Sequence, residues 1–130
     1  MIYFDSCALV KLLVAEAETD ALLRFISHHS SETHVTSALA RVEVVRAVRH
    51  LGQGAVDSAR DLLGHIDQLP ITPPLLDAAA GIGRTVLRSL DAIHLASAIR
   101  LEDALTAFVS YDKRLADAAH GAGLPIVGPA

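Results

Sequence analysis

The sequence begins with the stretch Met1-Ile2-Tyr3-Phe4-Asp5-Ser6, a short apolar run that ends in a carboxylate. The β-branched and aromatic side chains of Ile2, Tyr3 and Phe4 predict a strand buried on both faces, as in a parallel sheet. Asp5 then stands at the carboxyl end of this strand. Ligands of open α/β sheets bind beyond the carboxyl ends of the strands, so this carboxylate is either a helix cap or part of a site.

Outward from this stretch, strand-like segments alternate with segments of helical periodicity. The predicted helices cover residues 6–15, 20–29, 38–51, 55–68, 73–87, 91–101 and 112–120, and the further predicted strands cover residues 33–36, 69–72, 105–111 and 125–127. Ser37 and Ser89 stand where N-caps are expected, and Gly52 where a helix ends. Alternating strands and helices imply a parallel sheet covered on both faces. We therefore predict one α/β domain over residues 1–130, a three-layer α/β/α sandwich with a mainly parallel central sheet.

Composition narrows the class of protein. A chain of 130 residues with 52% hydrophobic residues suits one domain with a sizeable core. A net charge of -4 argues against a generally basic nucleic-acid-binding surface, so any such contact is local. The single cysteine excludes an internal disulfide and a cysteine-based metal cage. No apolar run reaches the ~18 residues that span a bilayer, and no charged leader is evident. These features predict a soluble cytoplasmic protein with no membrane contact.

Three aspartates occupy positions that have two explanations. Asp5 and Asp112 each follow a predicted strand, and Asp91 lies in the first turn of a predicted helix. Each alone can be an N-cap or an anion that favours the positive end of the helix dipole. A doubly wound sheet, however, brings the carboxyl ends of its strands to one edge, where all three would lie close together.

Glu43 has no such local explanation, because it lies in the middle of a predicted helix. It lies between Leu39 and Ala47, on the border of the apolar face. The simple alternative is an ion pair with Arg46, three residues on. Four converging carboxylates would repel one another unless a cation joined them. Mg²⁺ and Mn²⁺ prefer oxygen ligands and can also hold a phosphodiester, so the pattern favours metal-dependent phosphodiester hydrolysis.

Three motifs carry a resemblance to a known family. They are Met-Ile-Tyr-Phe-Asp-Ser-Cys-Ala-Leu-Val-Lys-Leu at residues 1–12, Ser-Leu-Asp-Ala-Ile-His-Leu-Ala at residues 89–96, and Phe-Val-Ser-Tyr-Asp-Lys-Arg-Leu at residues 108–115. Together they resemble a PIN-domain ribonuclease of the VapC toxin type, over essentially the whole chain. The resemblance implies a PIN-like fold and a Mg²⁺-dependent endoribonuclease, with Mn²⁺ as substitute, that leaves 5′-phosphate and 3′-hydroxyl ends.

Carried over by residue, the resemblance implies that Asp5, Glu43, Asp91 and Asp112 form the acidic metal site. Asp5, Asp91 and Asp112 would ligate or orient the metal and its waters, and Glu43 would complete the shell or position the attacking water. Ser6 and Ser110 match hydroxyl residues beside such sites. Cys7 stands where serine is common and is expected to be a small buried hydrophobe, with an oxidation-sensitive thiol as the alternative.

The resemblance also implies biological partners. Similar proteins are the toxins of type II toxin-antitoxin pairs, which cleave RNA and thereby inhibit translation and growth. They are often homodimers, and a small VapB-like antitoxin inhibits them by covering the active-site groove.

Further residues have weaker signals. Among seven histidines, none has the spacing of a zinc site. His94, three residues after Asp91, is either a packed helix residue or a contact at the edge of the site. The cations closest in sequence to the acids are Arg46, Arg49, Lys113 and Arg114, and they form a candidate basic rim for RNA, with solvated helix faces as the alternative.

Two other functions remain open from the sequence. A receiver-like signalling domain also gathers acids and Mg²⁺ at the edge of a doubly wound sheet, although a mid-helix Glu43 speaks against it. A catalytically idle module that binds RNA or a protein would not need Asp91.

Overall fold

Five parallel strands form the centre of the computed structural model, which describes residues 1–130. The strands are β1 (Ile2–Phe4), β2 (His34–Ser37), β3 (Asp67–Leu69), β4 (Ala107–Val109) and β5 (Ile126–Val127). Their order is β3-β2-β1-β4-β5, and every neighbouring pair is parallel. β1 is therefore central, with Ile2 opposite both His34 and Ala107.

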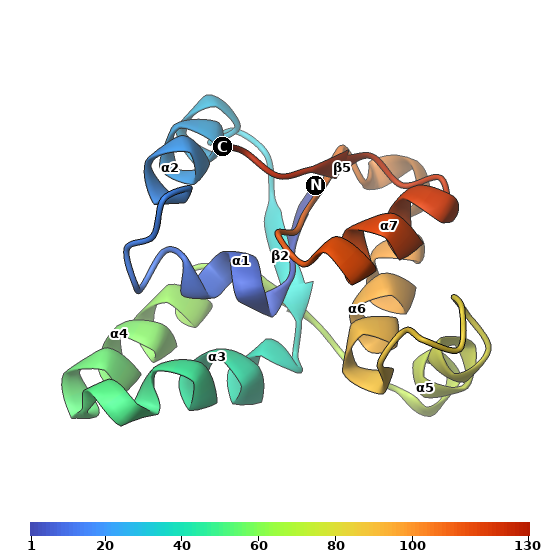
Figure 1. Cartoon of the computed structure of the whole chain (residues 1–130), viewed down its shortest axis with the longest axis horizontal. Helices are drawn as coiled ribbons and strands as arrows, with labels where there is room; N and C mark the ends of the chain where they lie inside the picture. The colour runs from blue at the N-terminus through green and yellow to red at the C-terminus, as the bar shows by residue number, and fades with distance from the viewer.

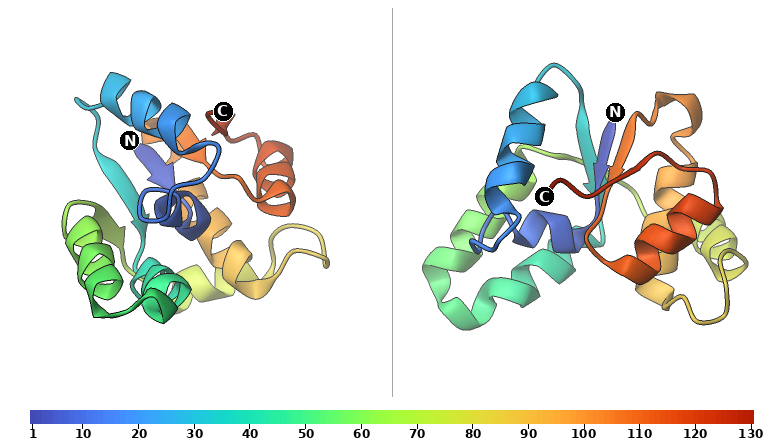
Figure 2. Two further views of the ribbon diagram at one scale, coloured as in Figure 1. Left: turned by 60° about the vertical axis from the view of Figure 1, so that its left-hand side comes forward. Right: turned by 45° about the horizontal axis from the view of Figure 1, so that its top comes forward.

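Helices cover both faces of this sheet (Figures 1 and 2). They are α1 (Ser6–Val10), α2 (Thr19–His28), α3 (Ala40–Val48), α4 (Gln53–Gly64), α5 (Pro73–Ala80), α6 (Ser89–Ile99) and α7 (Lys113–Gly121), with the 3₁₀ turns η1 (Arg49–Leu51) and η2 (Glu102–Ala104). In Figure 1, α1 to α4 lie on one side of the sheet and α5 to α7 on the other. The predicted three-layer α/β/α architecture is confirmed.

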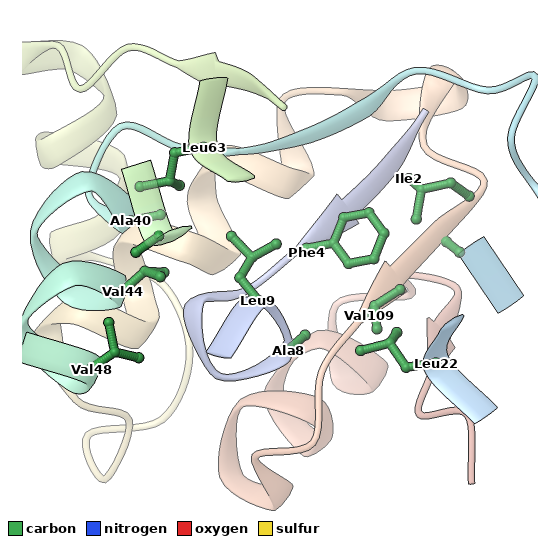
Figure 3. Packing of buried hydrophobic residues seen from close by; sticks show 12 residues of the cluster. Ile2, Phe4, Ala8, Leu9, Leu22, Ala40, Val44, Val48, Leu63 and Val109 are labelled. Atoms are coloured by element: carbon green, nitrogen blue, oxygen red, sulfur yellow. The ribbon is translucent and has the colours of Figure 1, made fainter. Parts of the chain in front are cut away.

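The alternation of side chains along the strands divides the core in two. Ile2 and Phe4 point to the face covered by α1 to α4, where they pack with Leu9, Leu22 and Val109 (Figure 3). Tyr3 points to the opposite face, where it packs with the residues of α6 and α7 in a second cluster. Because β1 is buried on both faces, its apolar run needs no polar alternation, as the sequence predicted.

The strand order argues against the receiver-like alternative. Flavodoxin-like signalling domains have the order 2-1-3-4-5, with the third strand next to the first. Here β3 lies beyond β2 at the edge, and β4 is the neighbour of β1. This different order places Asp112, after β4, directly beside Asp5, after β1.

Several predicted helix ends are wrong. The helix predicted over residues 6–15 ends at Val10, and residues 12–14 continue as turns that still pack against the core. The helix predicted over residues 55–68 instead runs from Gln53 to Gly64, which leaves Asp67 free to begin β3. The helix predicted over residues 73–87 ends at Ala80, before Gly83 with its φ of 71°. The helical periodicity of the apolar residues continues past these helix ends in the sequence, because the apolar residues beyond the ends also face the core.

The remaining differences concern strands and caps. The strand predicted over residues 69–72 ends at Leu69, and that over residues 105–111 is paired only over Ala107–Val109, because β1 offers three partners. The helix predicted over residues 38–51 divides into α3 and the turn η1. Ser89 is the first helical residue of α6 rather than its cap, which is Arg88. Gly52 does end the preceding turn, with a φ of 106°.

No helix is both long enough and apolar enough to cross a membrane.

Candidate active site

The site lies at the carboxyl edge of the sheet, where β1 and β4 end side by side. The amino ends of α1, α3, α6 and α7 gather at this edge (Figure 1). A cleft of about 500 Å³ opens there, and its walls are formed by Ser6, Cys7, Val10, Lys11, Glu16, Glu43, Ala47, Tyr111 and Asp112.

Asp5 is held rigidly at the end of β1 because both of its carboxylate oxygens accept hydrogen bonds. Oδ1 accepts from the Ala8 amide at 2.8 Å, which makes Asp5 the N-cap of α1, and Oδ2 accepts from the Ser110 hydroxyl at 2.5 Å. The side chain is buried, with 2% of Asp5 exposed. Burial raises the pKa of Asp5 above its usual range, the two hydrogen bonds oppose this shift, and the charge of Asp112 adds to it.

Glu43 projects from α3 toward α1 and α6. Its Oε1 accepts hydrogen bonds from the Ser6 hydroxyl and from His94 Nε2, both at 2.7 Å, whereas Oε2 has no hydrogen-bond partner. Burial by itself raises the pKa of Glu43, but the bonds from His94 and Ser6 outweigh it, so the pKa is lowered and the group is ionised. The alternative ion pair with Arg46 is absent, because the carboxylate points to the site instead.

Asp112 and Asp91 share one cation. Asp112 is the N-cap of α7, since its Oδ1 accepts from the Arg114 and Leu115 amides at 2.9 and 3.1 Å. Its Oδ2 faces Arg88 Nη2 at 3.5 Å, and Asp91 Oδ2 lies 3.3 Å from Arg88 Nε. Asp112 is therefore a helix cap and also a member of the cluster, as Asp5 is, so the two explanations offered by the sequence coexist.

The four acids lie in two linked sets. Ser110 joins Asp5 to Asp112, because its Oγ donates to Asp5 and accepts from the Asp112 amide at 3.2 Å, and Arg88 extends this set to Asp91. Glu43 belongs to the second set with Ser6, which follows Asp5, and His94, which lies one turn of α6 after Asp91. The starts of α1 and α6 thus bring the two sets together.

His94 combines the two interpretations that the sequence left open. It is buried in the body of α6, with 2% exposed, and it also bonds Glu43 at the site. Its Nδ1 lies 2.7 Å from the hydroxyl of Tyr3. From the sequence, Tyr3 was expected only in the core. A tyrosine in a fully buried strand could have indicated the site, because its hydroxyl needs a hydrogen-bond partner there.

The prediction that Cys7 is buried is wrong. The expected buried thiol is exposed and lines the cleft, because Ala8 and Leu9, not Cys7, form the inner face of α1. Partial desolvation and the negative charges of the acids, Asp5 and Asp112 foremost, raise the pKa of Cys7 to about 11. The side chain is thus a protonated thiol at neutral pH, which is a weak nucleophile.

The candidate RNA-contacting cations lie around the site without engaging its acids. Arg46, Arg49, Lys113 and Arg114 are all exposed, and none forms an ion pair. Arg114 lines a neighbouring groove of about 600 Å³ between α6 and α7. Lys11, in contrast, forms ion pairs, with its Nζ 2.7 Å from Glu16 Oε2 and 3.0 Å from Glu18 Oε2. The ion-paired cation at the acids is Arg88, three residues before Asp91.

The donor set fits a hard divalent ion. All four acids offer carboxylate oxygens, and Glu43 Oε2 and Asp91 Oδ1 make no hydrogen bond with the protein. No group of three or more His, Cys, Asp or Glu side chains is placed so that it could hold a metal ion together. Such an open arrangement suits Mg²⁺ or Mn²⁺, which keep several waters and are shared between carboxylates and a substrate phosphate.

Comparisons with known proteins identify the family of this chain. Residues 2–121 match the family model of the PIN domain. Ribonuclease VapC47 of Mycobacterium tuberculosis is 46% identical over 132 residues, which cover 99% of this chain and 97% of that protein.

Two solved structures share the fold. VapC20 of Mycobacterium tuberculosis, described as a toxin that cleaves the sarcin-ricin loop, superposes with a TM-score of 0.76 at 16% identity, covering 99% of this chain and all of that one. The VapBC2 complex of Rickettsia felis, bound to a DNA fragment from its promoter, superposes with a TM-score of 0.70 at 11% identity over the full length of both chains. With the carboxylates at the sheet edge and this full-length sequence identity, the chain belongs to the PIN-domain family, among its VapC ribonucleases.

Proposed function

We propose that this ribonuclease is a Mg²⁺- or Mn²⁺-dependent endonuclease, formed by one nuclease domain over residues 1–130. Its metal ligands would be Asp5, Glu43, Asp91 and Asp112. The observation that carries the proposal is the gathering of these four carboxylates, from four different elements, at the sheet edge, where Glu43 and Asp112 line one open cleft. Without a cation, such a set is electrostatically unfavourable in a partly desolvated site.

Each residue of the site has a distinct role in this proposal. When bound, the ion supplies Lewis-acid chemistry, in that it neutralises phosphate charge and makes a water molecule more acidic. Asp5 provides the fixed side of the site because Ala8 and Ser110 hold both its oxygens. Glu43 presents Oε2, either to complete the ligand shell or to orient the attacking water. Arg88 is the cation nearest the acids and contacts the scissile phosphate.

We further propose that the protein is the toxin of a type II toxin-antitoxin pair. Its relative VapC47 bears a VapC name, and the VapBC2 structure is a complex of two partners. The partner here would be a VapB-like antitoxin that covers the cleft, and the toxin would act as a homodimer in the cytoplasm. Its cleavage of RNA would inhibit translation and growth.

The metal requirement is tested on the purified protein. RNA cleavage is expected with Mg²⁺ or Mn²⁺, with no cleavage in excess EDTA and a loss of at least 100-fold for Asp91→Asn, as for lost metal ligands. Asp77→Asn, which changes an exposed aspartate on α5, is the matched control and should cleave as the wild type does. Full activity in EDTA, or products with 2′,3′-cyclic phosphate ends, would exclude this mechanism.

The toxin role is tested in cells. Inducible expression should arrest growth, co-expression of the adjacent open reading frame should relieve the arrest, and mapping of RNA 5′ ends should identify the cleaved RNA. An arrest that persists undiminished with Asp91→Asn would instead support the idle binding module.

A further inference from the structure

Tyr3, His94 and Glu43 form a chain of hydrogen bonds that runs from β1 through α6 to α3 and is buried at Tyr3 and His94. The Tyr3 hydroxyl lies 2.7 Å from His94 Nδ1, and His94 Nε2 lies 2.7 Å from Glu43 Oε1. Tyr3 is 0% and His94 2% exposed, so neither group can exchange its partner for water. An unmade bond in this chain would leave a buried polar atom unsatisfied.

The direction of the chain follows from its two ends. The Tyr3 hydroxyl has a proton to donate, and the carboxylate of Glu43 can only accept. A His94 ring that carries one N–H and satisfies both neighbours accepts from Tyr3 at Nδ1 and donates from Nε2–H to Glu43, which assigns the Nε2–H tautomer.

Both donors to Glu43 converge on the same oxygen. His94 and the Ser6 hydroxyl donate to Oε1 from opposite elements, α6 and α1, and Oε2 stays without a hydrogen bond. A glutamate has three rotatable side-chain bonds, and a free one loses entropy when it is ordered by a ligand. Bonds to one oxygen fix the carboxylate and leave the other oxygen available.

The far end of the chain is anchored in the core. The Tyr3 ring stacks on Phe108 of β4 with centroids 5.2 Å apart and an interplanar angle of 6°, and it meets the His94 ring edge-on at 5.9 Å. The central pair of strands thus holds the hydroxyl of Tyr3 in place. Phenylalanine would fill this volume equally well, so packing alone does not account for a tyrosine.

We propose that Tyr3 and His94 are positioning residues, which fix the carboxylate of Glu43 so that Oε2 is presented to the metal ion or its water. This inference rests on the proposed metal-dependent function. Tyr3 acts through His94, and His94 acts through Glu43; neither touches substrate.

Mn²⁺ affinity of the full-length, metal-free protein, measured by calorimetry, tests the proposal without any cleavage. Tyr3→Phe keeps the ring and removes the hydroxyl, and it should weaken Mn²⁺ binding about 10-fold. His94→Leu removes the donor to Glu43 and should weaken binding about 100-fold, whereas His94→Gln retains an N–H donor and should bind within about 3-fold of the wild type. Thr36→Val is the matched control, because it removes another buried hydroxyl bond, from Thr36 to the Phe4 carbonyl.

A second readout is the ¹⁵N NMR spectrum of the His94 ring in the metal-free protein. The wild type should show the Nε2–H tautomer, and Tyr3→Phe should populate the Nδ1–H tautomer. Wild-type Mn²⁺ affinity in Tyr3→Phe, an equal loss of affinity in Thr36→Val, or an Nδ1–H tautomer in the wild type would overturn the positioning role. A wild type that binds no Mn²⁺ would overturn the proposed function itself, and the inference with it.

Discussion

Asp5 uses its two carboxylate oxygens for two different purposes. One oxygen caps α1, and the other accepts from Ser110 at the edge of the acidic cluster. The cap stabilises the helix, but the buried charge is costly, because the pKa of Asp5 is raised mainly by desolvation. A buried carboxylate whose pKa is shifted by desolvation is a candidate functional group, which supports a place for Asp5 in the proposed metal site.

This cost predicts that Asp5→Asn stabilises the metal-free protein at neutral pH. The folded state binds the proton of Asp5 more tightly than the unfolded state does, so the wild type loses stability as the pH rises from the unfolded pKa through the folded one. Asparagine does not titrate and avoids this loss. Thermal melting in EDTA should give a Tm about 3 °C higher than the wild type at pH 7, with the difference vanishing near pH 3. A lower Tm at pH 7 would show that the cap needs the charge.

Among the elements, α7 begins after its N-cap Asp112, which is also one of the four acids of the cluster. Its Oδ1 satisfies two of the amides that a helix start leaves without partners. Its Oδ2 faces Arg88 and the other acids. The two oxygens have separable functions, because capping needs only an acceptor, whereas a metal ligand needs the charge.

Two substitutions separate these functions. Asp112→Ser retains an acceptor for the cap and should keep nearly wild-type stability, whereas Asp112→Ala should cost about 1 kcal/mol. Both should lose RNA cleavage, because both lose the carboxylate. Urea unfolding and a cleavage assay measure the two effects. Cleavage by Asp112→Ser at the wild-type rate would remove Asp112 from the metal site and leave it as a cap alone.

The segment before α6 holds a cation where a metal ion would be bound. Arg88 lies between Asp91 and Asp112 and is itself largely exposed, so little energy holds it there. It offsets part of the repulsion between the acids when no metal is present. Its guanidinium therefore competes with a metal ion for the same oxygens.

Arg88→Gln should consequently bind Mn²⁺ several-fold more tightly in calorimetry and bind RNA more weakly in a filter assay. The control is Arg84→Gln, since Arg84 belongs to the same segment, is exposed and has no ion pair. Weaker Mn²⁺ binding in Arg88→Gln would show that the guanidinium orients the acids instead of competing for them.

At the scale of the whole molecule, the charge distribution opposes RNA binding except near the site. The net charge is -4, and only local clusters of Lys and Arg can neutralise phosphates. Arg46 and Arg49 are exposed and unpaired at the carboxyl end of α3 and in η1, within two turns of Glu43. They are suited to contact the RNA backbone beyond the α3 side of the cleft.

The salt dependence of RNA binding measures these contacts. In EDTA, where no cleavage occurs, each of Arg46→Gln and Arg49→Gln should reduce the slope of log K against log salt by about 0.7. Arg60→Gln, an exposed position on α4, should leave the slope unchanged. A slope that none of these substitutions alters would assign the contacts to Lys113 and Arg114.

The α/β class, the two buried central strands and the elements that carry the four acids could all be predicted from the sequence, because these properties are local. A buried strand is a short apolar run, a helix is a 3.6-residue period, and an acid after a strand lies at the sheet edge. The ends of the helices depend on the tertiary structure. The helix α5 ends at Ala80, earlier than predicted, and Asp67 begins β3 instead of continuing a helix, because strand pairing and core contacts outweigh the helical periodicity.

The chemistry divides in the same way. From the sequence one could predict which acids and hydroxyls follow strands, and which acid and histidine lie on helices. Tertiary structure alone decided that Glu43 bonds Ser6 and His94 instead of Arg46, that Arg88 joins Asp91 to Asp112, and that Tyr3 belongs to the site. Apart from the Arg88–Asp91 pair, which is three residues apart, these contacts join residues 24 to 91 positions apart. Their geometry depends on the order of strands in the sheet, which no local pattern of residues encodes.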